Sequence, residues 1–342
     1  MKVFKTTEIR NVALIGGAKS GKTTMAESML FEGKSINRKG TVEDHNTVSD
    51  YKQIEIERQH SVHSSLLNTI FNDKKINIID TPGFSDFVGE TIAAIDAADT
   101  ALFLVNGQAG VEATTETAWR QTASNNTPVF FSINQLDHHG ANFDETIRAL
   151  KDYFGEKVTI VQYPVNAGEG FNTVIDLILM KQLTFKDGGG APEVSDIPDA
   201  EKDKAEELHL TLVENAAEGD EALMEKYFEH DTLTMDEMRE GVRLGMVSRS
   251  IFPVMCSSAK HGIGVNRILE FITLSCPAPD LMPAKKTSKG KEFSCKDSDP
   301  TALFVFKTSI ETHLGEVSFF NVLCGNVKEE QDLINKRSDN NE

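Results

Sequence analysis

A glycine-rich segment near the N-terminus has the residue types and spacing of a phosphate-binding loop. It follows the apolar run Val12–Ile15 and precedes Thr24–Met29, whose composition is typical of a helix. In such a loop the backbone N–H groups converge on phosphate oxygens, the lysine reaches the outer phosphates and the last hydroxyl ligates Mg²⁺. The segment fits G-x-x-x-x-G-K-[ST] with Gly16, Gly17, Ala18, Lys19, Ser20, Gly21, Lys22 and Thr23. These residues and Thr24 are predicted to bind a nucleotide, with Thr23 as a metal ligand.

A second polar turn, Asp80-Thr81-Pro82-Gly83, directly follows the apolar run Ile76–Ile79. An acid at the end of a strand beside a phosphate loop can hold Mg²⁺ through water, and the N–H of the glycine can meet a terminal phosphate. We therefore predict that Asp80 is a metal ligand. Gly83 is predicted to act in catalysis together with Lys22.

Two further loops contain groups that can recognise a base. Asp137, in the loop after Val129–Ile133, can accept hydrogen bonds from the adjacent ring and amino N–H groups of guanine, a pair that adenine does not offer. A carboxylate left unpaired by the wrong base is costly, so Asp137 predicts GTP over ATP. The loop after Ile251–Met255 would place backbone N–H groups against the guanine carbonyl. The predicted base-binding residues are Asn134, Gln135, Asp137, Ser258, Ala259 and Lys260.

Short apolar runs alternate with longer amphipathic or polar stretches, which is typical of a doubly wound α/β sheet. Ligands on such sheets bind at the carboxyl ends of the strands, where all of the motifs above lie. The expected strands include Val12–Ile15, Ile76–Ile79, Ala101–Val105, Val129–Ile133 and Ile251–Met255. The expected helices include Glu112–Ser124 and Asp144–Tyr153.

The pattern changes between Tyr163 and about residue 250. Gly188–Gly190 breaks the chain, and Asp199–Phe228 is predicted to be one long helix. Its apolar stripe would contain Leu208, Leu212, Ala216 and Leu223. Because strand-like composition resumes at Ile251, we expect an inserted α/β subdomain at about residues 160–250, within a nucleotide-binding domain that spans residues 1–283.

The last part of the chain is predicted to be a separate β-rich region. Residues 284–298 contain Lys285, Lys286, Lys289 and Lys291 among Ser, Thr and Gly, and are interpreted as a solvated linker, with a local RNA contact as the alternative. Residues 299–342 contain two β-rich runs, Ala302–Thr308 and Glu316–Leu323. Two strands cannot bury a core, so we expect the start of a β-barrel and a chain that is a fragment of a longer protein.

Composition limits the possible partners. A formal net charge of -18 argues against binding RNA or DNA through a broad basic face. No apolar run approaches the roughly 20 residues that cross a bilayer, and the N-terminus has no apolar signal core. The cysteines are widely spaced, which favours reduced thiols: Cys256, Cys276, Cys295 and Cys324. We expect a cytoplasmic monomer without DNA or membrane partners.

Taken together, these motifs resemble those of translational GTPases, and the flanking residues are similar to elongation factor G and its paralogues. The flanking matches are Gly110-Val111-Glu112, Glu116–Gln121 and His139–Phe143. The resemblance covers essentially the whole chain. It implies a P-loop GTPase fold, GTP/GDP and Mg²⁺ as cofactors, the ribosome as partner, and an insertion and a barrel start like those of the family. From this resemblance, we expect the family's three later domains to be absent from this sequence.

The residues around the expected hydrolysis site depart from the family. Where the family has a histidine that positions the attacking water, this chain has Phe84, which cannot do so; losing such a group commonly lowers the rate by about two decades. In the first switch segment the usual Gly-Ile-Thr is replaced by Gln59-His60-Ser61, in which Ser61 keeps a hydroxyl for Mg²⁺. One hypothesis is that His60 and Phe84 have exchanged places and His60 partly positions water. The alternative is a solvent-facing His60 and weak hydrolysis.

Two departures fall in the nucleotide pocket. Lys19 replaces an aspartate that helps many family members to hold a monovalent cation, so its ammonium could fill the cation's place and remove K⁺ dependence; otherwise it points to solvent. Gln135 replaces the lysine whose stem packs over the base, which predicts somewhat weaker binding with guanine specificity retained.

Three functions fit these residues. The first is a factor like elongation factor G that supports tRNA–mRNA translocation with weakened or altered GTP hydrolysis. The second is a ribosome protection, rescue or recycling factor in which GTP binding rather than hydrolysis acts. The third is a degenerate GTPase scaffold. Retention of Lys22, Thr23, Asp80 and Asp137 argues against the scaffold, since a site that no longer binds Mg²⁺–GTP does not need them.

Overall fold

A computed structural model describes residues 2–287, 290–311 and 314–341. It divides into a first unit that ends at Pro279 and a second that begins at Asp280. Within the predicted linker, Lys289 lies outside the described residues.

The first unit is built on a central sheet. In the described part of the chain this sheet has seven strands in the order β2-β3-β1-β4-β5-β11-β6, and neighbours are parallel except for the antiparallel pair β2–β3. The five predicted strands lie in β1, β3, β4, β5 and β11, whose residues are largely buried because helices cover both faces. The predicted doubly wound α/β class is confirmed. The strands are β1 (Ile9–Ile15), β2 (Ser65–Phe71), β3 (Lys74–Asp80), β4 (Thr100–Asn106), β5 (Val129–Asn134), β6 (Val158–Ile160) and β11 (Phe252–Cys256).

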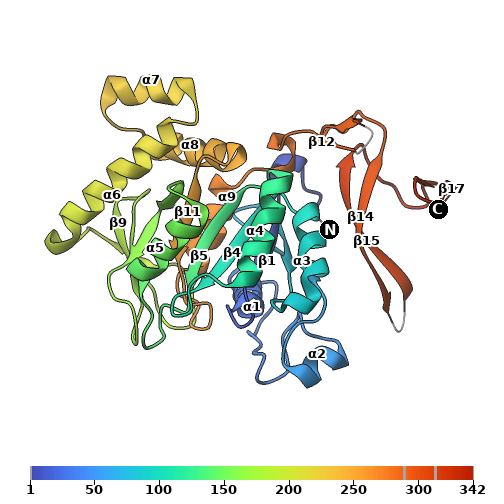
Figure 1. Cartoon of the computed structure of the whole chain (residues 1–342), viewed down its shortest axis with the longest axis horizontal. Helices are drawn as coiled ribbons and strands as arrows, with labels where there is room; N and C mark the ends of the chain where they lie inside the picture. The colour runs from blue at the N-terminus through green and yellow to red at the C-terminus, as the bar shows by residue number, and fades with distance from the viewer. Residues whose placement is uncertain (1, 288–289, 312–313, 342) are drawn as a thin grey trace. The chain divides into compact units, whose positions relative to one another are not determined.

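Helices lie on both faces of this sheet. In Figure 1, α3, α4 and α5 lie in front of it, and α1 and α9 lie behind it. On the front face, Trp119 of α4 packs its ring against Phe154 and Phe252 at centroid distances of 4.5 and 4.8 Å, so one aromatic cluster joins helices to strands. The helices are α1 (Lys22–Glu32), α2 (Gln53–Arg58), α3 (Val88–Ala97), α4 (Ala113–Asn125), α5 (Phe143–Phe154) and α9 (Val265–Ser275), with short 3₁₀ turns η1 (Thr6–Glu8) and η2 (Ser85–Phe87).

An inserted α/β segment connects β6 to β11. Its small sheet has the order β10-β9-β8-β7, with all neighbours antiparallel, and three helices follow it. The elements are β7 (Gln162–Pro164), β8 (Thr173–Asp176), β9 (Lys181–Thr184), β10 (Glu193–Ser195), α6 (Asp199–Ala217), α7 (Glu221–His230) and α8 (Met235–Ser248).

The prediction of one helix over Asp199–Phe228 is wrong. The chain forms α6 and α7, which Figure 1 shows running in different directions. The break falls at Gly219-Asp220, where Oδ1 of Asp220 accepts hydrogen bonds from the backbone N–H groups of Ala222 and Leu223 at 3.0 and 3.1 Å. This N-cap satisfies the first backbone amides of α7 and stabilises the start of a second helix. The apolar stripe alone did not predict this break.

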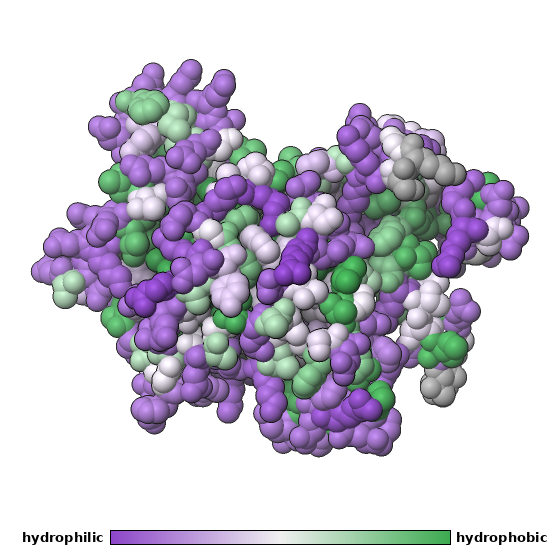
Figure 2. Space-filling view, in the orientation of Figure 1, coloured by the Kyte–Doolittle hydropathy of each residue, from purple (hydrophilic) through white to green (hydrophobic). Residues whose placement is uncertain are grey.

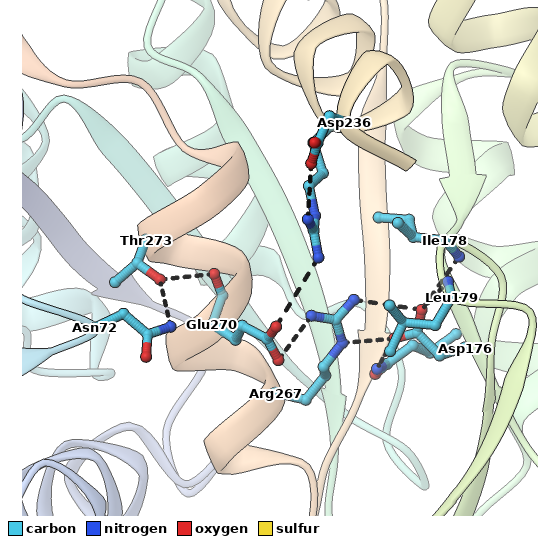
Figure 3. A network of polar contacts seen from close by, with 10 residues as sticks. Asn72, Asp176, Ile178, Leu179, Asp236, Arg267, Glu270 and Thr273 are labelled. Atoms are coloured by element: carbon cyan, nitrogen blue, oxygen red, sulfur yellow. Dashed lines mark hydrogen bonds and ion pairs between the residues drawn. The ribbon is translucent and has the colours of Figure 1, made fainter. Parts of the chain in front are cut away.

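A buried ion pair joins the insertion to α9 (Figure 3). Arg267 Nε of α9 lies 2.7 Å from Asp176 Oδ2 at the end of β8, and the two side chains are 3% and 0% exposed. Burial by itself raises the pKa of Asp176, but the charge and hydrogen bonds of Arg267 outweigh it and hold that pKa below its ordinary value. Glu270 on the next turn of α9 forms an ion pair with Arg267 Nη1 at 2.9 Å. Glu270 also lies within ion-pair distance of Arg239, which links the buried pair to α8.

The second unit is β-rich. Its main element is an antiparallel hairpin of β14 (Ala302–Glu311) and β15 (Gly315–Cys324). Hydrophobic side chains of the hairpin are exposed, among them Val305, Ile310 and Phe320, and Figure 2 shows hydrophobic surface there. The barrel start therefore stays a prediction. The remaining elements are η3 (Pro279–Leu281), β12 (Lys285–Lys286), β13 (Glu292–Phe293), β16 (Ile334–Asn335) and β17 (Asn340–Asn341). Across the residues described in both units, we find no helix with the length and apolar character needed to span a bilayer.

Candidate nucleotide-binding site

The predicted phosphate loop connects the end of β1 to the start of α1. Gly16 and Gly21 have φ angles of 154° and 91°. A Cβ atom on Gly16 would lie 2.4 Å from Leu104 O, and one on Gly21 would lie 2.4 Å from Asn134 Nδ2. Both positions therefore require glycine, and the backbone can pass close to β4 and β5 before it enters the helix.

Lys22 is buried at the start of α1, and its ammonium group lies across the loop. Nζ donates to the carbonyl oxygens of Gly16 and Gly17 at 2.9 and 2.7 Å. Burial lowers the pKa of Lys22 to about 8, although the nearby carboxylates of Asp80 and Glu112 act in the opposite direction. The loop thus presents a desolvated cation at the place where a phosphate group would bind.

The three predicted metal ligands lie together. Thr23 Oγ1 donates to Asp80 Oδ2 at 2.8 Å and lies 3.2 Å from Ser61 Oγ. Asp80 Oδ1 is buried and has no hydrogen-bond partner among the described residues. Two hydroxyls and one carboxylate with an unused oxygen fit Mg²⁺, which takes few protein ligands and fills its other positions with water and phosphate oxygens.

The charge at this site supports the same interpretation. Burial raises the pKa of Asp80 from 3.8 to about 7, and the charge of Asp50 adds to the increase. Asp50 is itself buried, and burial also raises its pKa. Two buried acids close to each other are the environment that a divalent cation would stabilise. The sequence analysis did not assign Asp50 to the site, because its proximity to Asp80 depends on how the segment before α2 folds.

Asn134 joins three loops at the carboxyl ends of the strands. Its Nδ2 donates to Ser20 O at 2.8 Å, and its Oδ1 accepts from Ser257 Oγ at 3.1 Å and from Ala259 N at 2.9 Å. The N–H of Ala259 therefore supports the loop and does not face an open base site in this structure. Ser258 is fully buried, whereas Lys260 is exposed and its carbonyl accepts from Lys39 Nζ at 2.6 Å.

Asp137 lies beside these loops with one oxygen unused. Oδ1 is buried without a hydrogen-bond partner in the described part of the chain. Oδ2 lies 3.5 Å from His261 Nε2, and the other ring nitrogen of His261 lies 2.9 Å from Asp187 Oδ1. The orphaned oxygen fits a carboxylate that receives the N–H groups of a base. The sequence analysis missed His261, although it directly follows Lys260.

Comparison with known proteins decides the family. Residues 7–278 match the model of the elongation factor Tu GTP binding domain. The chain belongs to this family. It is also similar to a crystal structure of a protein from Thermus thermophilus, with a TM-score of 0.85 and 28% identity; the match covers 96% of this chain and 47% of that one. The chain thus spans about half the length of this structural relative, and it has a GTPase domain of the elongation factor Tu type.

Within this elongation-factor GTPase domain, the side chains of His60 and Phe84 are in contact. Their ring centroids are 4.5 Å apart, and Phe87 is 6.1 Å from His60. The His60 ring is half-buried and its Nδ1 lies 3.2 Å from Ser61 O, while Phe84 is 39% exposed. The structure therefore brings together the two residues of the exchange hypothesis, next to Ser61, which is predicted to be a metal ligand.

Lys19 and Gln135, the two residues of the nucleotide pocket that differ from the family, have different environments. Lys19 has a φ angle of 63° and is exposed, so the solvent-facing alternative fits its position. Gln135 also has a positive φ, of 61°, and its Nε2 donates to Lys19 O at 2.9 Å. Its Oε1 accepts from Asn106, so the amide bridges β4 to the phosphate loop. A lysine at this position could not make both contacts, because it has no acceptor.

Carboxylates that no motif predicts hold the first switch segment. Glu55 Oε1 accepts from the backbone N–H groups of Val62 and His63 at 3.0 and 2.9 Å. Glu27 on α1 accepts from Gly40 N at 3.0 Å and from Val48 N. Both acids are buried, and their role follows from backbone contacts that the sequence does not display. Of the other predicted residues, Ala18, Thr24 and Gly83 lie half-exposed around the phosphate loop.

Proposed function

We propose that this chain is the GTP-binding part of a ribosome-associated translation factor that resembles elongation factor G and has weakened or altered GTP hydrolysis. The observation that carries the proposal is the convergence of Thr23, Ser61 and Asp80 beside the buried ammonium of Lys22. These groups match the requirements of a magnesium-bound triphosphate, and Asp137 supplies an acceptor for guanine.

Each residue has a role that its own chemistry supports. Amides of residues 16–23 and the ammonium of Lys22 would hold the phosphates, and the Gly83 N–H would meet the terminal phosphate. Thr23 and Ser61 would ligate Mg²⁺, with Asp80 acting through water; the ion, when bound, neutralises charge on the phosphates. The Phe84 ring can neither donate nor accept a proton, so water would be oriented by backbone groups and, in the exchange hypothesis, by His60.

The candidate functions differ in whether GTP must be hydrolysed, only bound, or not bound at all. If hydrolysis is slow but triggered on the ribosome, the protein supports translocation as elongation factor G does. If binding alone suffices, it acts as a protection, rescue or recycling factor, and the contact between His60 and Phe84 favours neither. A scaffold without nucleotide is the weakest candidate, because the buried charges of Lys22 and Asp80 would have no ligand to offset them.

The proposal includes the setting in which the factor works. The ribosome is its partner, and the protein acts as a cytoplasmic monomer without DNA or membrane partners. Because the net charge is -18, contacts to ribosomal RNA would be local, and the lysines at residues 285–291 are one place for them.

Nucleotide titration followed by turnover assays tests the proposal. Calorimetry of the 342-residue chain with GDP, a non-hydrolysable GTP analogue and ADP in Mg²⁺ buffer should give tight binding of the guanine nucleotides alone. Phosphate release from GTP, with and without ribosomes, then measures hydrolysis. Equal binding of ADP, or no nucleotide binding, would contradict the proposal. Binding without ribosome-stimulated turnover would favour the second function.

A further inference from the structure

The carboxyl group of Glu112 lies against the phosphate loop. A Cβ atom built on Gly17 would be 2.3 Å from the carboxyl carbon of Glu112 and from both of its oxygens, so this group stands directly over the Gly17 backbone. The two residues are 95 positions apart in the sequence. Gly17 is a variable position of the G-x-x-x-x-G-K-[ST] pattern, and here it is the lack of a side chain that leaves room for the acid.

Glu112 is not needed for the helix that it begins. It is the N-cap residue of α4, but its side chain makes no capping hydrogen bond. The start of the helix depends on its backbone, whose carbonyl accepts from Thr115 N at 2.9 Å and from Glu116 N at 3.3 Å. A glutamate is a poor N-cap compared with Ser, Thr, Asp or Asn, so local helix stability does not explain this side chain.

The same point on the loop is approached by two groups that the proposed function assigns to the terminal phosphate. Lys22 Nζ donates to Gly17 O at 2.7 Å. A Cβ atom on Gly83 would lie 2.5 Å from Lys22 Nζ and 2.7 Å from Gly17 O. Glu112, Lys22 and Gly83 therefore surround Gly17. Burial raises the pKa of Glu112 and the charge of Lys22 lowers it, which indicates that the carboxylate shares its surroundings with the ammonium.

We propose that Glu112 sets the preference of the site between GTP and GDP, because its carboxylate opposes the terminal phosphate of GTP and leaves the two inner phosphates of GDP less affected. The inference rests on the proposed GTP binding. It adds a residue that weakens the binding of GTP relative to that of GDP. Like charges within about 6 Å at an effective dielectric constant of about 20 change affinity by at least tenfold. A free factor would then favour GDP until another contact moves Glu112 away.

Neutralising the acid without changing its shape tests this inference. In calorimetry on the full chain at about pH 7.5, Glu112→Gln should bind a non-hydrolysable GTP analogue about tenfold more tightly than the parent. Its affinity for GDP should change by less than about threefold. Unchanged GDP binding also shows that the variant is folded. The expected result is a shift in the ratio of the two dissociation constants.

A control on the same helix distinguishes the effect of the Glu112 carboxylate from the effect of removing any one negative charge from α4. Glu116→Gln removes a carboxylate one turn along α4 that pairs with Arg120 at 2.6 Å, and it should leave the ratio unchanged. An unchanged ratio in Glu112→Gln, or weaker binding of the GTP analogue, overturns the inference. If the parent binds neither guanine nucleotide, the proposed function itself has failed, and that outcome is distinct from a failure of this inference.

Discussion

At the scale of single residues, we predict that base recognition depends on Asp137. Its Oδ1 is buried without a partner among the described residues, so a bound base would satisfy it. Asp137→Asn should weaken GDP binding by about 2–3 kcal/mol, roughly 100-fold, since the amide replaces one acceptor oxygen with an NH₂ group that would face a donor of guanine. Xanthosine diphosphate has a carbonyl where guanine has the amino group, and it should bind the variant better than GDP does. Titration with both nucleotides checks this, and retained GDP affinity would contradict it.

The pair of His60 and Phe84 gives a second prediction at this scale. Phe84→His should raise ribosome-stimulated GTP hydrolysis by about tenfold or more, because it restores a group that can orient water. His60→Ala should lower the residual rate only if His60 positions water in the parent. Single-turnover phosphate release with and without ribosomes measures both variants. No further loss in His60→Ala would refute the exchange of roles and leave the ring contact as packing.

The sequence predicts the location of a site residue best where the neighbouring residues in the chain determine its surroundings. Lys22 and Thr23 follow from one local pattern, and Asp80 follows from a strand end. Glu112 and His261 could not be predicted in the same way. Their contacts with Gly17 and Asp137 join segments that are far apart in sequence, and a lone carboxylate or imidazole carries no signal of its own.

At the scale of elements, the ion pair of Arg267 and Asp176 fastens the insertion to α9. Removing the cation leaves a buried carboxylate without compensation, so Arg267→Met should lower the free energy of unfolding by about 3–5 kcal/mol at pH 7. Urea denaturation measures the loss. Adding Asp176→Asn to the same variant should recover most of it, because no buried charge then remains. Failure of the second change to rescue would show that the loss comes from packing.

The loss should also depend on pH. In the parent, the pKa of Asp176 lies below its ordinary value of 3.8, so its contribution is present above pH 3.8 and is lost as pH falls through the lowered pKa. Without Arg267, burial raises that pKa instead, and the buried acid can be protonated at mildly acidic pH. The stability difference between parent and Arg267→Met should therefore be largest near neutral pH and shrink towards about pH 4. A difference that does not change with pH would contradict this account.

Two helical glycines test how closely the helices pack. A Cβ atom on Gly241 of α8 would lie 2.4 Å from Ala216 O of α6, whereas one on Gly89 of α3 would meet nothing within 4 Å. Gly241→Ala should therefore destabilise the protein by about 1–3 kcal/mol. Gly89→Ala should stabilise it by up to about 1 kcal/mol, because alanine is the better helix former. Denaturant midpoints of the two variants should move in opposite directions, and a shared direction would contradict the packing argument.

The elements themselves were predictable where apolar runs recur. Buried parallel strands are nearly continuous in Val, Ile, Leu and Phe, so β1, β3, β4, β5 and β11 were recognised. The antiparallel edge strand β2 was not, since Asn68 and Thr69 interrupt its apolar residues and Ser65–Phe71 contains no continuous apolar run. The break between α6 and α7 was missed for a different reason: an apolar stripe continues past Gly219-Asp220, and one capping side chain starts a new helix there.

At the scale of the whole molecule, the candidate site and the exposed hairpin belong to different units. Every residue predicted to bind nucleotide or Mg²⁺ precedes Pro279, and the core of the first unit includes Cys276 and Ala278 at its end. The second unit instead exposes Val305, Ile310 and Phe320. Nucleotide binding should therefore persist when the second unit is removed.

A chain that ends at Pro279 should bind GDP within about threefold of the 342-residue chain, because it keeps the complete site and its own core. It should also remain monomeric at higher concentration, since it lacks the exposed hydrophobic hairpin. Calorimetry compares the affinities, and light scattering compares association. In both chains, GDP at about 100 times its dissociation constant should stabilise the folded first unit by roughly 2.7 kcal/mol. Loss of GDP binding in a truncated chain that still unfolds cooperatively would mean that residues after Pro279 contribute to the site.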